Sequence, residues 1–447
     1  MKDSMKTWAQ KALALMMALL LITGAVPGLA EQTAEEIYTE GMKYLKGDGV
    51  DKDLNKAFLL LKQAAEMDYA PAQYETALCY QFGDGVEKDE EQALAWLQKA
   101  AHQNYDKAVF WMGRVHFYGW LGFDFDVKTA REYYEKAAEL GNVEASIQLG
   151  FMYETGQSVE RNYDKAREYY EKAAATHPKA LSHLGFMHMN GWGVPQDDEK
   201  AVALLQEAVD KGSVTYLEHL GWYYEKGVVV QQDYQKAIEL YQKGVESGLG
   251  YYHTLLGRLH RDGRGFEQSY EKAMEEFQLG ALANDPEAYI NIGHLYKDGL
   301  GVEKDEEKAQ QMYLAAYNAY YQSTHRLNVW LIIGYLREHG LGIEQSLEAA
   351  HSVYERSVSL DDSRIGMYHM ARFYENGLHV EKNLEQALAL YKQSADHGYP
   401  DAYVKLGIFA AEGLGMEKDL NLAKEYFTQA QKRGAEGVEE LLKKYGL

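Results

Sequence analysis

A single pattern of small, apolar and polar positions repeats along the chain after about the first 30 residues. Its most regular feature is a glycine that recurs every 35 to 41 residues, and we call these residues the marker glycines. They are Gly47, Gly83, Gly119, Gly156, Gly191, Gly227, Gly263, Gly299, Gly340, Gly377 and Gly413. Repetition at a period of this length is the signature of an array of supersecondary units. The pattern therefore predicts eleven copies of one unit, and not the roughly three domains that length alone would suggest.

Each copy has the pattern of two helices joined by a turn. A second small residue, glycine or alanine, lies six residues before each marker glycine, as at Gly113, Gly150 and Gly221. Glycine inside a helix costs about 1 kcal/mol relative to alanine, so its recurrence predicts the close approach of a partner helix. We call the helix before the marker glycine helix A and the helix after it helix B.

The start of every helix B carries the same polar signal. Aspartate, asparagine or serine stands there in each copy, and these side chains accept a hydrogen bond from a free backbone N–H, which is worth about 1 kcal/mol. An alanine follows four residues later and a large apolar or aromatic residue four residues after that, which places one stripe on a single helical face. The predicted N-cap residues are Asp53, Asp89, Asp126, Asn162, Asp197, Asp233, Ser269, Asp305, Ser346, Asn383 and Asp419.

The first 30 residues have the layout of a secretory signal peptide. Lys2, Lys6 and Lys11 precede an uncharged apolar stretch, Pro27 then breaks the helix, and small residues follow where a peptidase would cleave. The alternative is an uncleaved membrane anchor, because about 19 uncharged residues are just enough to span a bilayer. We expect cleavage, no membrane span in the mature chain, and an extracellular, cell-surface or periplasmic location.

Charge and cysteine content exclude several classes of protein. The chain has 46 Lys and Arg against 68 Asp and Glu, a formal net charge of −22. This balance argues against nucleic-acid binding, which needs a basic face, and favours neutral or basic partners. The single cysteine, Cys79, cannot form an intramolecular disulfide or a cysteine-based zinc site. The stability of the chain must therefore come from packing.

The residues of the fourth copy identify a family resemblance. They resemble the Sel-1-like repeat (SLR), a branch of the tetratricopeptide-type helical repeats, at Leu149, Gly150, Tyr153, Gly156, Lys165, Ala166, Tyr169, Tyr170, Lys172, Ala173 and Ala174. The second turn glycine of the family is replaced in three copies, by Ser158, Val229 and His379. The resemblance implies an all-α fold, a right-handed α-solenoid of about eleven helix-turn-helix repeats. It also implies a role as an adaptor or scaffold for other macromolecules.

One motif allows an enzymatic hypothesis. Ser269 and Lys272 have the SxxK spacing of serine acyl-enzymes, but the companion Ser-Asp-Asn and Lys-Thr-Gly motifs are absent from the sequence. Ser269 is also a predicted N-cap, and lysine recurs at the position of Lys272 in other copies. We therefore interpret the motif as part of the repeat and predict that the chain is not an enzyme.

The fifteen histidines do not form a recognisable zinc motif. His116, His188 and His260 lie 72 residues apart, which is two copies each time, and they replace the usual tyrosine of helix A. We expect packed rings at these positions and no shared metal. The sequence contains no P-loop, dinucleotide fingerprint or G-x-S-x-G elbow, so we predict neither a metal nor a cofactor.

A candidate binding surface lies on helix A, which lines an extended groove in solenoids of this kind. The residue five positions before each marker glycine is expected to point outward, and this position holds neither glutamate nor lysine in any copy. Aromatic and arginine side chains, which are typical of interface hot spots, are frequent there. The alternative is that Phe151, Phe186 and Trp222 pack between neighbouring helices. The candidate groove residues are Arg114, Phe151, Phe186, Trp222, Arg258, His294, Tyr335 and Arg372.

Two segments depart from the regular array. The interval of 41 residues before Gly340 contains an aromatic insertion near residues 317–330. It could lengthen two helices, form an aromatic projection, or be a neutral insertion in a turn, which we favour. After the last copy, residues Val438 to Tyr445 predict an amphipathic helix. The expected organisation is a signal peptide at 1–30, repeats over 31–436 and a capping helix at 437–447.

The sequence as a whole predicts an exported, non-enzymatic scaffold that binds another protein or a peptide through the groove. The main alternative is a binder of cell-envelope glycan or peptidoglycan that stacks sugars on the same aromatic side chains. A third hypothesis is hydrolysis of a β-lactam or a wall component. Nucleic-acid partners are not expected. The sequence does not identify the partner, the host or the oligomeric state.

Overall fold

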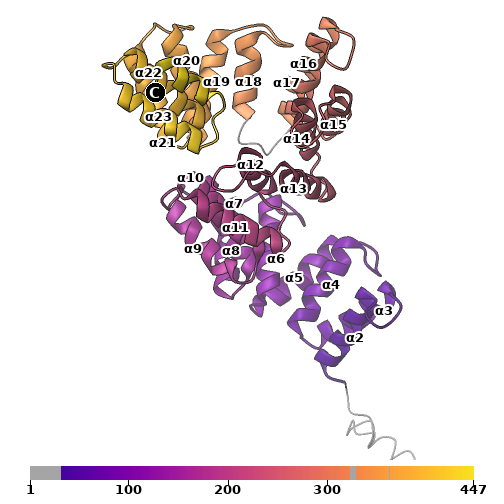
Figure 1. The fold of residues 1–447 in the computed structure, drawn as a ribbon. Helices are drawn as coiled ribbons and strands as arrows, with labels where there is room; N and C mark the ends of the chain where they lie inside the picture. Colours follow the sequence, from indigo (N-terminus) through magenta and orange to yellow (C-terminus); the bar gives the residue numbers. More distant parts are fainter. Residues whose placement is uncertain (1–31, 323–328, 362) are drawn as a thin grey trace, which may run out of the picture. The chain divides into compact units, whose positions relative to one another are not determined.

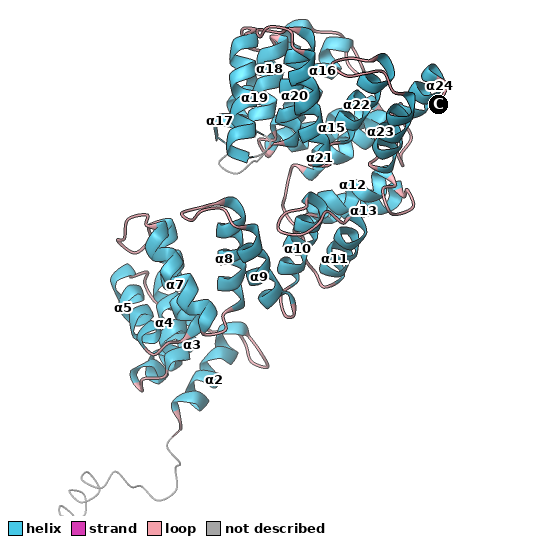
Figure 2. Cartoon of the chain, turned by 90° about the vertical axis from the view of Figure 1, so that its left-hand side faces the viewer, coloured by secondary structure: helices cyan, strands magenta, loops and turns pink. Residues whose placement is uncertain are grey.

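The computed structural model describes residues 32–322, 329–361 and 363–447, and within these ranges it contains 23 helices and no strand (Figures 1 and 2). The predicted signal peptide lies outside the described residues. The chain divides into two compact units, which comprise residues 1–149 and 150–447. We describe each unit by itself.

The first unit contains six helices and the beginning of a seventh. Helices A and B pack as pairs in its first three repeats, and helix B of the first two repeats packs against the next helix A. The helices are α2 (Ala34–Lys46), α3 (Leu54–Glu66), α4 (Ala70–Phe82), α5 (Glu90–His102), α6 (Asp106–Tyr118), α7 (Val127–Glu139) and α8 (Val143–Thr155), within which the boundary falls.

The second unit continues the same alternation. Its further helices are α9 (Tyr163–Ala174), α10 (Pro178–Asn190), α11 (Asp198–Asp210), α12 (Leu217–Lys226), α13 (Tyr234–Glu246), α14 (Tyr252–Asp262), α15 (Tyr270–Leu282), α16 (Pro286–Asp298), α17 (Glu306–Gln322), α18 (Val329–His339), α19 (Leu347–Asp361), α20 (Arg364–Asn376), α21 (Leu384–Asp396), α22 (Pro400–Glu412), α23 (Leu420–Lys432) and α24 (Val438–Tyr445). None of the described helices is long and apolar enough to cross a membrane.

The predicted helix starts are confirmed at all eleven positions. Each predicted cap side chain accepts a hydrogen bond from a backbone N–H two or three residues further on, at distances of 2.8 to 3.2 Å. At Asp53, for example, the carboxylate accepts from the N–H of Lys56 at 3.0 Å. The caps satisfy backbone donors that have no partner inside the helix.

The small residues of helix A are explained by close packing against helix B, as predicted. A Cβ atom added to Gly113 would lie 2.6 Å from the ring of Tyr134, and one added to Gly407 would lie 2.5 Å from the ring of Phe427. Both rings are almost completely buried. The large side chain of helix B therefore occupies the space that a helix A side chain would fill.

The three replaced turn glycines keep the backbone conformation of glycine. Ser158, Val229 and His379 have φ angles of 59°, 54° and 63°. Left-handed φ is costly for a β-branched residue such as valine, so the surrounding turn must impose it. The described part of the insertion lengthens α17 to 17 residues, against 13 for most of the other helices.

Candidate interaction surface on helix A

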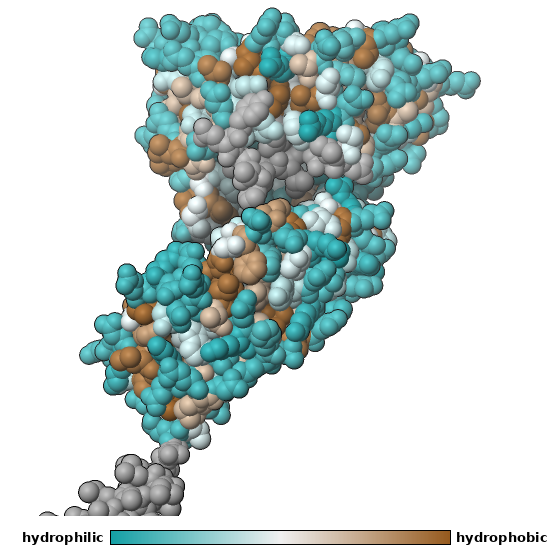
Figure 3. Space-filling model, turned by 180° about the vertical axis from the view of Figure 1, so that it is seen from behind, coloured by the Kyte–Doolittle hydropathy of each residue, from teal (hydrophilic) through white to brown (hydrophobic). Residues whose placement is uncertain are grey.

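The eight candidate groove residues differ widely in exposure. Phe151 is 39% exposed, whereas Phe186 is 7% exposed. The other six are half-buried. Seen from one side, most of the surface is hydrophilic, with small separate groups of hydrophobic residues (Figure 3). The position is therefore not a uniform exposed row, and each member has to be judged from its contacts.

The prediction that Phe186 points outward is wrong. Its ring stacks on Tyr216 with ring centroids 4.4 Å apart, and it also contacts Trp192 and His219. Residues 181–189 of α10 are buried on every side, so this helix has no solvent-facing stripe. The position that was expected to face solvent therefore lies in the interior of this repeat.

The other aromatic members are partly packed against their own units. Trp222 packs at the edge of the core that contains Tyr223, and His294 lies edge-on to Tyr313 with centroids 5.5 Å apart. Burial lowers the pKa of His294, so its imidazole is neutral at pH 7. Tyr335 lies 4.4 Å from His339, centroid to centroid. The packing alternative therefore holds for Phe186 and in part for Trp222, and His294 is partly packed as well.

In the first unit the candidate position belongs to a group of exposed aromatic side chains. We define the Arg114 patch as Phe82, Trp111, Arg114, Tyr118 and Trp120, together with Phe125. The ring of Phe125 reaches the patch through Phe117, which contacts both Phe125 and Tyr118. Four of its rings are among the most exposed large hydrophobic side chains in the described structure, at 60% for Phe82, 52% for Tyr118, 37% for Trp120 and 65% for Phe125. Exposed aromatic groups of this kind are uncommon on a soluble protein and mark interaction sites.

Arg114 is held by these rings. Its guanidinium carbon lies 4.3 Å from the ring centroid of Trp111, 5.3 Å from that of Trp120 and 5.7 Å from that of Tyr118. Cation–π contacts of this kind stabilise an arginine without using its hydrogen-bond donors. Within the described part of the chain, Arg114 makes no hydrogen bond and no ion pair.

In the second unit Arg372 holds the same position with a different set of contacts. Its Nη2 donates to Oε1 of Glu338 at 3.0 Å, and its Nη1 donates to Nδ1 of His369 at 3.1 Å. Tyr354 donates its hydroxyl to the other oxygen of Glu338 at 3.0 Å. Burial, and then the charge of Arg372, lower the pKa of His369 to about 4, although Glu338 opposes this. The imidazole is therefore neutral at pH 7 and accepts through Nδ1.

The contact between Tyr354 and Glu338 is one of four equivalent pairs that sequence reasoning missed. In each pair a tyrosine of helix B donates to a glutamate that lies 16 residues earlier and two residues before a marker glycine. The pairs are Tyr170 with Glu154, Tyr241 with Glu225, Tyr354 with Glu338 and Tyr391 with Glu375. Glutamate is absent from this position in every copy whose helix B lacks the tyrosine. That co-occurrence is a sequence signal that could have revealed the pairs.

Each of these glutamates also contacts a basic side chain of the following repeat. His183 Nδ1 lies 3.2 Å from Glu154, Arg264 donates to Glu225 at 3.2 Å, and Lys405 donates to Glu375 at 2.9 Å. In the fourth pair, Arg372 donates to Glu338, as described above. Glu154, Glu225 and Glu338 are buried and Glu375 is partly buried, and a carboxylate removed from water is stable only when it is paired and hydrogen-bonded. The four glutamates therefore tie consecutive repeats of the second unit together.

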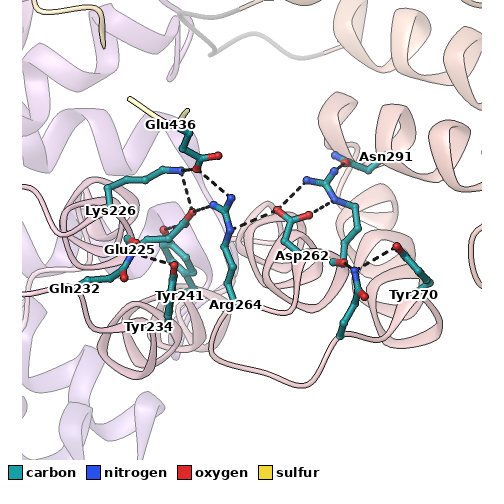
Figure 4. A network of polar contacts seen from close by, with 12 residues as sticks. Glu225, Lys226, Gln232, Tyr234, Tyr241, Asp262, Arg264, Tyr270, Asn291 and Glu436 are labelled. Carbon is teal, nitrogen blue, oxygen red and sulfur yellow. Dashed lines mark hydrogen bonds and ion pairs between the residues drawn. The ribbon is translucent and has the colours of Figure 1, made fainter. Parts of the chain in front are cut away.

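One of these networks reaches the end of the chain (Figure 4). Lys226 and Arg264 both donate to Glu436, at 2.7 and 3.0 Å, and Arg264 also donates to the buried Glu225. Lys226 and Glu436 are 210 residues apart in the sequence. Within the second unit, the segment before α24 thus contacts the end of α12. The cleft between these segments is lined by residues of both.

The residues of the enzymatic hypothesis have structural partners. The Ser269 hydroxyl accepts from the backbone N–H of Lys272 at 3.2 Å and donates to Glu271 at 3.1 Å, as a helix cap does.

Two of the histidines that replace the helix A tyrosine are packed rings, as expected. His116 stacks on Tyr133 and His260 stacks on Phe266. Burial lowers the pKa of both histidines. The described residues contain no group of three or more His, Cys, Asp and Glu side chains that could hold a metal ion.

Paired helices with regular glycine turns and capped second helices define this chain as an α-helical repeat protein. A family description, the Sel1 repeat, matches eleven of its segments, and the chain therefore belongs to the Sel1 repeat family. The segments are 41–69, 70–105, 106–142, 143–175, 178–213, 217–249, 251–285, 286–321, 332–362, 365–399 and 400–434. The all-α solenoid expected from the sequence is confirmed. Repeats of this family generally form scaffolds for protein–protein interaction.

Two solved structures and one curated protein illustrate the likeness. The crystal structure of c5321, "a protective antigen present in uropathogenic Escherichia coli strains displaying an SLR fold", is 26% identical, covers 92% of this chain and 86% of its own, and has a TM-score of 0.52. A Sel1 repeat protein from Oxalobacter formigenes is 23% identical over 78% of this chain and 90% of its own, with a TM-score of 0.35.

The curated protein is the "Putative ERAD-associated E3 ubiquitin-protein ligase component" of Schizosaccharomyces pombe, which is 38% identical over 78 residues. The match spans 17% of this chain and 11% of the length of that relative.

Proposed function

We propose that this chain is an exported, non-enzymatic scaffold that binds another protein or a peptide on the exposed face of its A helices. The observation that carries the proposal is the presence of solvent-exposed aromatic and unpaired arginine side chains on that face, above all at Arg114 and Phe151. Such side chains are enriched in interface hot spots. The general role of Sel1 repeats in protein interaction supports the same function.

Export is supported by the layout of residues 1–30. The likeness to c5321, which is described as a protective antigen, agrees with it. Fusing residues 1–35 to a reporter enzyme that has no signal of its own tests this part. We expect secretion of a reporter cleaved after Ala30, as determined by N-terminal sequencing. An uncleaved reporter held in the membrane fraction would show that the segment is an anchor.

The binding face is tested by site-specific photocrosslinking. A photoreactive phenylalanine analogue replaces Phe151, which lies on helix A, and in a control protein it replaces Leu282, which is 81% exposed on helix B. We expect crosslinked adducts that are sensitive to protease and form only from position 151. Adducts from both positions, or adducts removed by glycan hydrolases, would contradict the proposal, and the second result would favour a glycan partner.

A further inference from the structure

The Arg114 patch combines two features that occur together nowhere else among the eight candidate positions. It presents exposed aromatic rings that form a continuous path, because Phe82 contacts Trp111, Trp111 contacts Trp120, and Trp120 stacks on Tyr118. It also presents a guanidinium that makes cation–π contacts with these rings but has no hydrogen-bond or ion-pair partner among the described residues. A binding partner for this surface must satisfy both features.

The first feature calls for apolar side chains. The rings lie at different angles, 78° between Phe82 and Trp111 and 42° between Trp111 and Trp120, and one face of Tyr118 stacks on Trp120. Because the rings are not coplanar, the surface is uneven, which suits large apolar side chains. A sugar would need open ring faces with polar groups at the margin, because hydroxyls that lose water without gaining partners are costly.

The second feature calls for a carboxylate. The cation–π contacts use none of the N–H groups of Arg114 as hydrogen-bond donors, and no described residue accepts from them, so the planar fork of N–H groups can match the two oxygens of a carboxylate. The surrounding rings fix the guanidinium before a ligand arrives, so less side-chain entropy is lost on binding.

The preceding repeat explains why Arg114 lacks such a partner in its own chain. In the second unit, Arg372 pairs with Glu338, which lies two residues before the marker glycine of the preceding repeat. Gln81 holds that position before Arg114, and its Oε1 is buried without a hydrogen-bond partner among the described residues. An amide carries no charge, so the guanidinium remains available.

We propose that the Arg114 patch binds an internal peptide segment of a partner protein that carries one aspartate or glutamate flanked by large apolar residues. The carboxylate pairs with Arg114, and the apolar side chains pack on Phe82, Trp120 and Phe125. The formal charge of −22 disfavours segments with several acidic residues, because the chain as a whole repels them. This inference rests on the proposed scaffold function and names the partner chemistry of one part of its surface.

Peptide display tests the inference. A library of random peptides, displayed as constrained loops without a free carboxyl terminus, is selected on purified protein carrying all eleven repeats. The selected peptides are then synthesised. We expect each to contain one acidic residue beside two or more of Trp, Phe, Leu and Ile. Binding should weaken at least about tenfold in Arg114→Gln, and by a similar factor when the acidic residue of the peptide becomes its amide.

Matched variants separate binding from folding. Phe125→Ser and Leu59→Ser both remove a side chain that is 65% exposed, but only Phe125 belongs to the Arg114 patch. Phe125→Ser should weaken binding, and Leu59→Ser should not, with helix content unchanged in both. Selected peptides without an acidic residue, or binding unaffected by Arg114→Gln, would overturn the inference. Binding of a soluble peptidoglycan fragment that is lost in Arg114→Gln, with no peptide selected, would also overturn it.

The two proposals can fail separately. A protease-sensitive adduct from position 151 together with an unsuccessful peptide selection would leave the scaffold function intact and refute the assignment of the Arg114 patch.

Discussion

Arg114 in the first unit and Arg372 in the second occupy the same position of the repeat but are used differently. Arg114 makes cation–π contacts with Trp111, Tyr118 and Trp120 and has no charged partner in the described chain. Arg372 is bound to Glu338, which is buried. The difference lies in the preceding repeat, which supplies Gln81 in one case and Glu338 in the other.

We infer that the residue two positions before the marker glycine of the preceding repeat decides the role of an arginine at the candidate position. A glutamate there binds the arginine into the array, whereas a glutamine leaves it available for a partner. In the second unit, glutamates two residues before the marker glycines connect helix B of their own repeat to a base of the next. The described part of the first unit has no glutamate at this position. The comparison can be tested by removing the carboxylate where it exists and by adding it where it does not.

The largest effect is expected for Glu338→Ala. The substitution leaves Arg372 and the Tyr354 hydroxyl without their buried partner, which should cost about 3–5 kcal/mol of local unfolding free energy. Hydrogen–deuterium exchange in α18 to α20 measures this, because stability in a repeat array is local. Gln81→Ala is the matched control and should change exchange in α4 to α6 by less than about 1 kcal/mol. Equal losses at the two sites would contradict the comparison.

Acid should destabilise the second unit through His369. Its pKa is about 4 in the folded chain and 6.5 as the ordinary value, so the unfolded chain binds more protons between these pH values. The stabilisation is complete above pH 6.5 and is lost as the pH falls towards 4, a change of about 3 kcal/mol.

Exchange rates in α20 measured from pH 7 to pH 4, corrected for intrinsic exchange, check this expectation. In His369→Gln, the corrected exchange rate of α20 should change less between pH 7 and pH 4 than in the wild type. Helices α2 to α4, which contain no histidine, serve as the internal reference. A profile for α20 that is the same in both proteins would show that His369 does not carry the effect.

Adding a carboxylate to the first unit should convert Arg114 to the arrangement of Arg372. In Gln81→Glu, the new carboxylate should pair with Arg114, because Glu338 pairs with Arg372 from the equivalent position. Binding of a selected peptide should then weaken about tenfold, which corresponds to about 1.4 kcal/mol. Isothermal titration with the wild-type and variant proteins measures the loss. Gln81→Asn, which adds no charge, should bind the peptide nearly as well as the wild type.

The smallest effect is expected at the exposed end of the network in Figure 4. Glu436 is 65% exposed, so Glu436→Gln should cost only about 0.2–1 kcal/mol in exchange of α12 and α24, despite losing two ion pairs. The loss should shrink further in high salt. A cost comparable to that of Glu338→Ala would mean that exposure does not govern the strength of these pairs.

Much of the fold was predictable because its determinants are local. The marker glycines, the caps such as Asp53 and the contact between Gly113 and Tyr134 follow from spacing along one or two helices. The surface was less predictable. Phe186 is buried by Tyr216 of the next repeat, and the availability of Arg114 depends on Gln81 of the preceding repeat. Such contacts between repeats require the three-dimensional structure, although the co-occurrence of glutamate and tyrosine carries part of the information.

Chemical labelling of the two arginines tests the central claim most directly. Phenylglyoxal reacts with free guanidinium groups, and peptide mass spectrometry resolves the rate at each residue. We predict that Arg114 reacts several-fold faster than Arg372 in the wild-type protein, and that Gln81→Glu slows Arg114 to about the rate of Arg372. Equal rates in the wild type, or an Arg114 rate unchanged by Gln81→Glu, would contradict the account.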